Sequence, residues 1–244
     1  MNVWAIADLH LCNGNAAKSM DIFGSRWDNY MAQIEKNWSF LVKDEDLVLL
    51  AGDISWAGKL EEAEKDLAFI DALPGTKIMI KGNHDFWWSS LAKMKQVFPT
   101  SIIPIQQTVY FSDQYVITGT RLWESSAIHI DRDIYENVNF DYEYQETEQD
   151  QKIFQREIER LKAVLQQLPS DDRIKIVMTH YPPIGTDGKK TIISQILEDY
   201  GVSICVFGHL HNVRYPTAHF QVAGETKYFL VAADYLSFQP LKIL

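Results

Sequence analysis

The chain has 244 residues, of which 46% are hydrophobic and 12% are aromatic. This length and composition are typical of a folded protein with a large core, and they exclude an intrinsically disordered chain. The formal net charge of −10 argues against a broad basic surface for long nucleic acid, because binding of that kind depends on neutralising many phosphates.

The first half of the chain alternates short apolar runs with amphipathic stretches, which is the pattern of successive strand–helix units. The second amphipathic stretch is followed by Pro74-Gly75, a pair that stops a helix. The predicted elements in chain order are a strand near 3–7, a helix over about 27–43, a strand at 47–51, a helix at 60–73, a strand at 77–81 and a helix near 89–97.

Residues 102–119 contain turn residues between short apolar runs, which predicts antiparallel hairpins at a sheet edge. A long charged helix is predicted at 151–168, followed by two more strand–helix units and by further strands within 215–243. The acidic segment 124–150 is either a solvated loop or a lid over a substrate. We therefore expect a single domain over 1–244, with 124–150 as a possible lid insertion.

Five short polar motifs each follow an apolar run. They are Asp8-Leu9-His10, Gly52-Asp53, Gly82-Asn83-His84-Asp85, Thr179-His180 and Gly208-His209-Leu210-His211. Apolar runs of this length are typical of buried parallel strands, and open α/β sheets bind ligands beyond the carboxyl ends of their strands. We therefore expect all five motifs to meet in one crevice. Oxygen and imidazole donors without a paired thiolate favour a divalent ion such as Mn, Fe or Zn.

Spacing within the motifs supports the same interpretation. In extended backbone, residues two apart project to the same side, so Asp8 with His10, and His209 with His211, could each offer two ligands to one centre. The glycines of these motifs predict tight turns and close backbone approach at Gly52, Gly82 and Gly208.

Taken together, the five motifs resemble those of the calcineurin-like metallophosphoesterase superfamily. The resemblance implies an α/β fold, a four-layer αββα sandwich of two mixed β-sheets flanked by helices, with the metal site at the carboxyl ends of the strands. It implies two divalent metal ions (Mn, Fe or Zn, with Mn favoured) that share a hydroxide, which attacks a phosphate ester as the nucleophile. The protein would then be an enzyme, a phosphoric ester hydrolase.

The resemblance also implies a role for each motif residue. The implied metal ligands are Asp8, His10 and His211 at one ion, Asn83, His180 and His209 at the other, and Asp53 as the bridge. His84 would protonate the leaving group or bind the phosphate together with Asn83, and Asp85 would orient the His84 imidazole. Arg121 follows a predicted strand end and could bind a phosphate bidentately, but a surface ion pair is an equal alternative.

The motif residues also bear on the branch of the superfamily. Protein Ser/Thr phosphatases carry Asp-Arg-Gly after Gly-Asp, which the run 54–58 lacks, and lipid-pathway UDP-sugar pyrophosphohydrolases have Arg where His84 stands. We expect a small bacterial-type phosphohydrolase of small phosphomonoesters or phosphodiesters. A metal-dependent nuclease on short or single-stranded nucleic acid is one alternative, and a non-catalytic metal-binding interaction module is another.

The remaining features concern packing and location. Aromatic residues are dense around the motifs, and we expect them to pack between sheets and helices rather than to stack on a ligand: Trp56, Phe86, Trp87, Trp88 and Trp123. Cys12 and Cys205 are too few for a disulfide framework, so we expect reduced thiols in a cytoplasmic protein. The first strand begins near residue 3 and apolar runs are short, so neither a signal peptide nor a membrane partner is expected.

Overall fold

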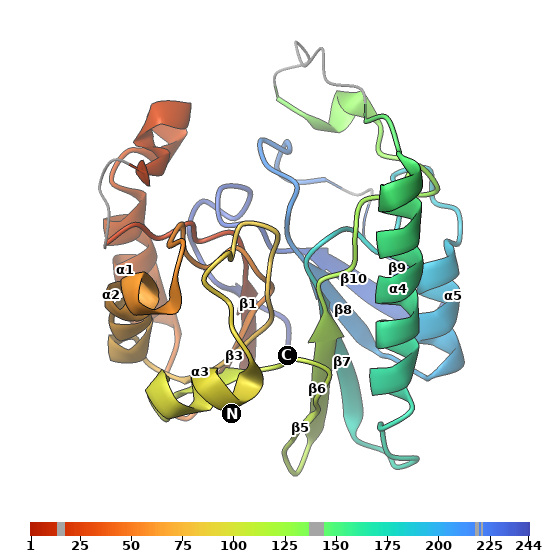
Figure 1. The fold of residues 1–244 in the computed structure, drawn as a ribbon, viewed down its shortest axis with the longest axis horizontal. Coiled ribbons are helices and arrows are strands. Elements are labelled where there is room, and N and C mark those ends of the chain that lie inside the picture. The colour runs from red at the N-terminus through yellow and green to blue at the C-terminus, as the bar shows by residue number, and fades with distance from the viewer. Residues whose placement is uncertain (14–17, 137–143, 218–219, 221) are drawn as a thin grey trace.

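The computed structural model describes residues 1–13, 18–136, 144–217, 220 and 222–244. Two β-sheets face each other, and helices cover the outer side of each sheet (Figure 1). The first sheet has the strand order β11-β1-β2-β3-β4 and the second has the order β5-β6-β7-β8-β10-β9. Both sheets mix parallel and antiparallel pairs. The predicted αββα sandwich is therefore confirmed.

The first sheet is built from the first half of the chain and from the last residues. Its central strands are parallel, with Val3 opposite Leu47 and Leu47 opposite Thr76. The elements of this half are β1 (Val3–Ile6), α1 (Tyr30–Leu41), β2 (Leu47–Leu50), α2 (Leu60–Ala72), β3 (Thr76–Met79), α3 (Leu91–Val97), β4 (Ile102–Pro104) and β11 (Leu241–Lys242).

Alternation of side chains along the strands divides the core into two parts. Val3 and Ala5 of β1 belong to the core that is shared with the second sheet. Trp4 and Ile6 point the other way and belong to the cluster that contains Trp38 of α1. Because both faces of these strands are buried, the strands read as continuous apolar runs in the sequence.

The second sheet is built from the second half of the chain, and α4 and α5 cover its outer face (Figure 1). Its elements are β5 (Tyr110–Phe111), β6 (Tyr115–Thr120), α4 (Glu148–Leu165), β7 (Ile174–Thr179), α5 (Ile192–Asp199), β8 (Ile204–Phe207), β9 (Val222–Ala223) and β10 (Thr226–Leu230). Helix α4 begins earlier than predicted because Thr147 and Asp150 form a reciprocal capping box at its start.

Two sequence-based expectations for this half are wrong. Within the segment 102–120, only β5 and β6 form an antiparallel hairpin, whereas β4 extends the first sheet parallel to β3 and β6 runs parallel to β7. The chain crosses between the sheets after Pro104, which local turn signals do not reveal. After β8, no helix follows in the described residues, and β10, which comes after β9, pairs in parallel with β8.

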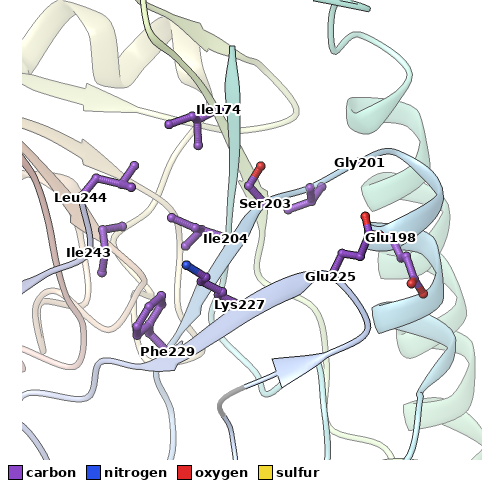
Figure 2. A pocket seen from close by; sticks show the side chains of 11 residues that line it. Ile174, Glu198, Gly201, Ser203, Ile204, Glu225, Lys227, Phe229, Ile243 and Leu244 are labelled. Carbon is purple, nitrogen blue, oxygen red and sulfur yellow. The ribbon is translucent and has the colours of Figure 1, made fainter. Parts of the chain in front are cut away.

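A pocket of about 430 Å³ lies at the amino ends of β7 and β8 (Figure 2). Ile174, Ser203 and Ile204 line it together with the last two residues, Ile243 and Leu244. The residues that follow the carboxyl ends of β7 and β8 lie at the opposite ends of these strands from the pocket. No helix of the described chain is both long and apolar enough to cross a membrane.

Candidate metal centre

The five motifs meet beyond the carboxyl ends of β1, β2, β3, β7 and β8, where their side chains form two overlapping groups. In each group, one ligand atom from each residue lies within 4.8 Å of the others. The members are Asp8, His10 and His211 in one group, and Asp8, Asp53 and His180 in the other. The convergence that the strand-end positions predict is therefore found in the structure.

In the first group, the two imidazoles face each other across the site. The Nε2 atoms of His10 and His211 are 3.3 Å apart, and His211 Nε2 lies 3.9 Å from Asp8 Oδ1. The carboxylate oxygen Asp8 Oδ1 is buried and has no hydrogen-bond partner. An anionic oxygen without a donor, beside two ring nitrogens, suits a cation in this position.

Asn83 and His209 extend the second group, because the amide oxygen of Asn83 lies close to two imidazoles. Asn83 Oδ1 is 2.5 Å from His180 Nε2 and 3.1 Å from His209 Nδ1. The carboxylate oxygen Asp53 Oδ2 is 3.5 Å from His180 Nε2 and 3.7 Å from His10 Nε2. Asp53, a member of the second group, therefore also approaches His10 of the first group, as a bridging ligand would.

We expected extended backbone at the motif residues, but the backbone is left-handed at several of them. The φ angles are 57° at Asp8, 45° at His10, 53° at Asp53 and 71° at His209. This breaks the side-chain alternation of an extended chain. Within this one cluster of side chains, His209 contacts Asn83 whereas His211 contacts His10.

Two glycines allow the motifs to approach one another. A Cβ atom at Gly82 would overlap the Asp53 carboxylate and backbone nitrogen, and one at Gly208 would overlap the Asp8 carboxylate. Any larger residue would have to displace a candidate ligand. The prediction of close backbone approach at these glycines is thus confirmed.

Burial disfavours charge on most groups of the site, whereas at His211 burial is outweighed by the hydrogen bond with Asp234 and by the charge of Asp8, which raise its pKa to about 9. Burial raises the pKa of Asp8 and of Asp53, while it lowers the pKa of His10 and brings that of His180 to about 3. Both ring nitrogens of His180 lie close to oxygens that can only accept, Nδ1 at 3.0 Å from the Ala51 carbonyl oxygen and Nε2 at 2.5 Å from the Asn83 amide oxygen, so the neutral ring can donate to only one of them. Neutral imidazoles and poorly solvated carboxylates are the donors that divalent ions stabilise. The residues present therefore fit two such ions.

His84 lies beside the groups and belongs to neither. Its imidazole is 4.5 Å from the Trp56 ring and 5.7 Å from the His10 ring, measured between centroids. Its backbone N–H donates to Asp53 Oδ1 at 2.8 Å. Within the described residues, no protein group forms a hydrogen bond with this imidazole. The ring is half-buried and lies beside the candidate centre.

Asp85 does not orient His84, contrary to our expectation. Its carboxylate accepts five hydrogen bonds from other groups, and no bond to His84 is found in the described part of the chain. The five donors are the backbone N–H groups of Asp53, Ile54, Ser55 and Gly82 and the indole N–H of Trp87. Asp85 is fully buried. It therefore holds the loop that carries Asp53 rather than the His84 ring.

Arg121 lies at the border of the site. Its carbonyl oxygen accepts from the backbone N–H groups of His180 and Tyr181 at 3.2 and 3.0 Å. Its guanidinium lies 4.5 Å above the Trp123 ring, and no ion pair of Arg121 occurs within the described ranges. Among the other aromatic residues, Trp87 is packed in the core, whereas Trp56 stacks on His10 at 4.8 Å.

Sequence reasoning missed Asp234, whose Oδ1 atom is 2.9 Å from His211 Nδ1. The signal was present, because Asp234 follows the apolar run that continues from β10. The acidic segment 124–150 is only partly described, and its residues 137–143 lie outside the described residues. Its function as a lid stays a prediction.

Comparison with solved structures supports the fold. A phosphopantetheinyl hydrolase from Mycobacterium tuberculosis is 14% identical, with a TM-score of 0.58 over 100% of this chain and 95% of that chain. An anchor protein of the inner membrane complex of Plasmodium is 11% identical, with a TM-score of 0.51 over 96% of this chain and 72% of that chain. At these identities, the similarity concerns the fold and not the activity.

Comparison of the sequence with known proteins gives two further findings. An uncharacterised protein of Methanocaldococcus jannaschii is 29% identical over 83 residues, which is 34% of this chain and 46% of that protein, so the match spans less than half of the relative. The sequence pattern described as calcineurin-like phosphoesterase matches residues 1–213. That range contains all five motifs. The chain therefore belongs to the calcineurin-like phosphoesterase family, a family of metal-dependent phosphoester hydrolases.

Proposed function

We propose that this protein hydrolyses a small phosphomonoester or phosphodiester with the help of two divalent ions. The observation that carries the proposal is the position of Asp53, whose Oδ2 atom lies 3.7 Å from His10 and 3.5 Å from His180. One carboxylate is thereby shared by two groups of donors. Carboxylate, amide and imidazole donors without a thiolate favour manganese, with iron and zinc as the other candidates.

The proposed ligands divide between the two positions as the contacts do. One ion would be held by Asp8, His10 and His211, the other by Asn83, His180 and His209, and Asp53 would bind both. When bound, such ions acidify water and neutralise the charge of a phosphoryl group. Because Asn83 is a neutral ligand, the loaded site would keep a net positive charge toward an anionic substrate.

His84 is the proposed acid. Its half-buried imidazole is held beside the site by Trp56 and by the backbone bond to Asp53. In this position it would donate a proton to the leaving-group oxygen or hydrogen-bond to a phosphoryl oxygen. Asn83 would contribute to substrate binding from the neighbouring position. Arg121, next to His180 in the backbone hydrogen-bond pattern, is the proposed contact for a more distant anionic group.

A substrate panel tests this function. Protein stripped with a chelator would be reloaded with manganese, iron or zinc and offered aryl mono- and diesters, cyclic nucleotides, nucleoside diphosphate derivatives and a single-stranded oligonucleotide. We expect metal-dependent turnover of a small ester. Loss of the oligonucleotide alone would instead identify a nuclease, and two bound equivalents of metal without any turnover would identify a non-catalytic module.

A pair of variants tests the bridge. Asp53→Ala should lose metal and essentially all turnover, whereas Asp46→Asn should retain both. Asp46 is an equally buried carboxylate that binds the backbone of Asn2 and the indole of Trp4, away from the site. An Asp53→Ala variant with two equivalents of metal would contradict the bridging assignment. We also propose a cytoplasmic location, which the two buried, unpaired cysteines support.

A further inference from the structure

Asp234 lies against the candidate metal centre, although it belongs to none of the five sequence motifs. After β10, the chain crosses from the second sheet to the first, where Ala232 forms a parallel bridge with Ala7. The backbone N–H of Ala233 donates to the carbonyl oxygen of Ala7 at 2.9 Å. These contacts fix the next residue, Asp234, beside the loop that carries Asp8. Asp234 lies outside the range matched by the family pattern.

The Asp234 carboxylate binds the His-x-His segment at two points. Its Oδ1 atom is 2.9 Å from His211 Nδ1, and its Oδ2 atom accepts from the backbone N–H of Asn212 at 2.7 Å. The carboxylate is buried, and a carboxylate oxygen can only accept. The Nδ1 atom of the His211 ring therefore carries a hydrogen. The Nε2 atom faces His10 and Asp8 and is the ring nitrogen left to bind an ion.

We infer that Asp234 is a positioning residue that fixes the tautomer and the ring orientation of His211, so that His211 can bind a divalent ion together with Asp8 and His10. The inference rests on the proposed function, because it assumes that this group of donors holds an ion. Carboxylates that accept from the far nitrogen of a metal-binding imidazole typically contribute about 10–100-fold to metal affinity.

The effect should be confined to one of the two metal positions. Among the described residues, His211 is the only proposed imidazole ligand whose far nitrogen faces a carboxylate. His180 Nδ1 faces the carbonyl of Ala51, and His10 Nδ1 has no partner. Removing the Asp234 carboxylate should therefore weaken the ion at Asp8, His10 and His211 and leave the ion at Asn83, His180 and His209 nearly unchanged.

Arg26 supplies the charge that makes a buried carboxylate tolerable here. Its Nη1 atom lies 3.8 Å from Asp234 Oδ2, and its other nitrogen pairs with Glu136. The backbone N–H of Glu136 in turn donates to the carbonyl oxygen of Asn212 at 2.8 Å. A separation of 3.8 Å is too long for an orienting hydrogen bond. The orientation of His211 thus depends on Asp234, and Arg26 compensates the charge of the Asp234 carboxylate.

Metal titration of the full chain tests the inference. Manganese would be titrated into the metal-free wild type, Asp234→Ala and Asp234→Asn by calorimetry, and the loaded proteins would be examined by electron paramagnetic resonance. We expect two equivalents in the wild type. In Asp234→Ala, the affinity for one equivalent should fall about 10–100-fold. At one bound equivalent per chain, the spectrum of a coupled pair should then give way to that of isolated Mn²⁺.

Two further variants separate an effect on His211 from a general loss of folding. Asp234→Asn has nearly the same shape and retains one acceptor oxygen, so it should fold and show a smaller loss at the same equivalent. Asp46→Asn, which alters a buried carboxylate away from the site, should bind both equivalents as the wild type does. Wild-type affinity for both equivalents in Asp234→Ala and Asp234→Asn, or an equal loss at both positions, would overturn the inference.

The result can be separated from that of the proposed function. If the wild type binds two equivalents but hydrolyses no phosphate ester, the proposed function fails while the affinity difference at one position still establishes the role of Asp234. If the wild type binds no manganese, both are overturned.

Discussion

Substitution of Gly82 by alanine is the most direct probe of the site's geometry. An added Cβ would overlap the Asp53 carboxylate, with the Cγ atom only 2.8 Å away, and it would also overlap the Asp53 backbone nitrogen. The Asp53 nitrogen is tied to Asp85 at 2.9 Å, so the backbone cannot easily retreat. We expect the carboxylate to move instead.

The expected size of the effect follows from these contacts. Overpacking of a filled interior costs about 1–3 kcal/mol. For a chain of this size, a loss of that order lowers the melting temperature by about 2–12 °C, taking about 2–4 °C per kcal/mol. A displacement of Asp53 by about 1 Å would reduce turnover by about 100-fold. Metal affinity should fall at both positions, because Asp53 is shared between them.

Gly58→Ala is the matched control. A Cβ at Gly58 would meet only the end of the Glu62 side chain, at 3.4 Å, which is a tolerable contact. Thermal unfolding of the metal-free proteins and manganese stoichiometry by elemental analysis would be measured for both variants. If Gly82→Ala melts within error of Gly58→Ala and binds two equivalents of manganese, the close approach of Gly82 to Asp53 does not control the centre.

Three further predictions concern single side chains of the site. His84→Ala should retain its metal and should slow alkyl esters more than nitrophenyl esters, because protonation matters least for a good leaving group; equal slowing would exclude the acid role. Asp85→Asn should lower the urea midpoint of unfolding, because each buried donor left unpaired costs about 1–3 kcal/mol. The ratio of the hydrolysis rates of alkyl and nitrophenyl esters should stay as in the wild type. A change in that ratio would indicate that Asp85 orients the His84 imidazole after all. Burial lowers the pKa of His180 to about 3. Between pH 6.5 and 3 the unfolded chain therefore binds the proton that the folded chain excludes, so stability falls as the pH falls. The metal-free wild type should lose more stability than His180→Asn between pH 6.5 and 4, and parallel urea midpoints would refute this.

The elements that hold the site could be predicted because their signals are local. Apolar runs ending in a carboxylate, amide or imidazole predicted β1, β2 and β3 to within about two residues, and predicted that strands precede His180 and His209, where β7 and β8 are found. Parallel strands present their carboxyl ends at one edge of a sheet, so the convergence of the motifs followed without knowledge of the order of strands. The sheet that β4 joins could not be predicted in this way, since its pairing with β3 depends on contacts distant in sequence.

The role of Asp85 shows the limit of motif reasoning. Adjacency in the sequence suggested that it serves His84, but its oxygens face the loop from Asp53 to Ser55, about 30 residues away. A carboxylate binds the donors that the fold places around it, and three of the five donors here are backbone N–H groups of another strand end. The sequence does not reveal which donors these are.

The sequence by itself determined the chemistry of the centre, because the types of donor and their places at strand ends are written in short motifs. The tertiary structure alone decided how those donors are divided. Left-handed backbone at Asp8, His10 and His209 turns side chains that an extended chain would have aligned. Non-glycine residues adopt this conformation only where surrounding contacts hold them in it. The same contacts bring Asp234, remote in sequence from every motif, against His211.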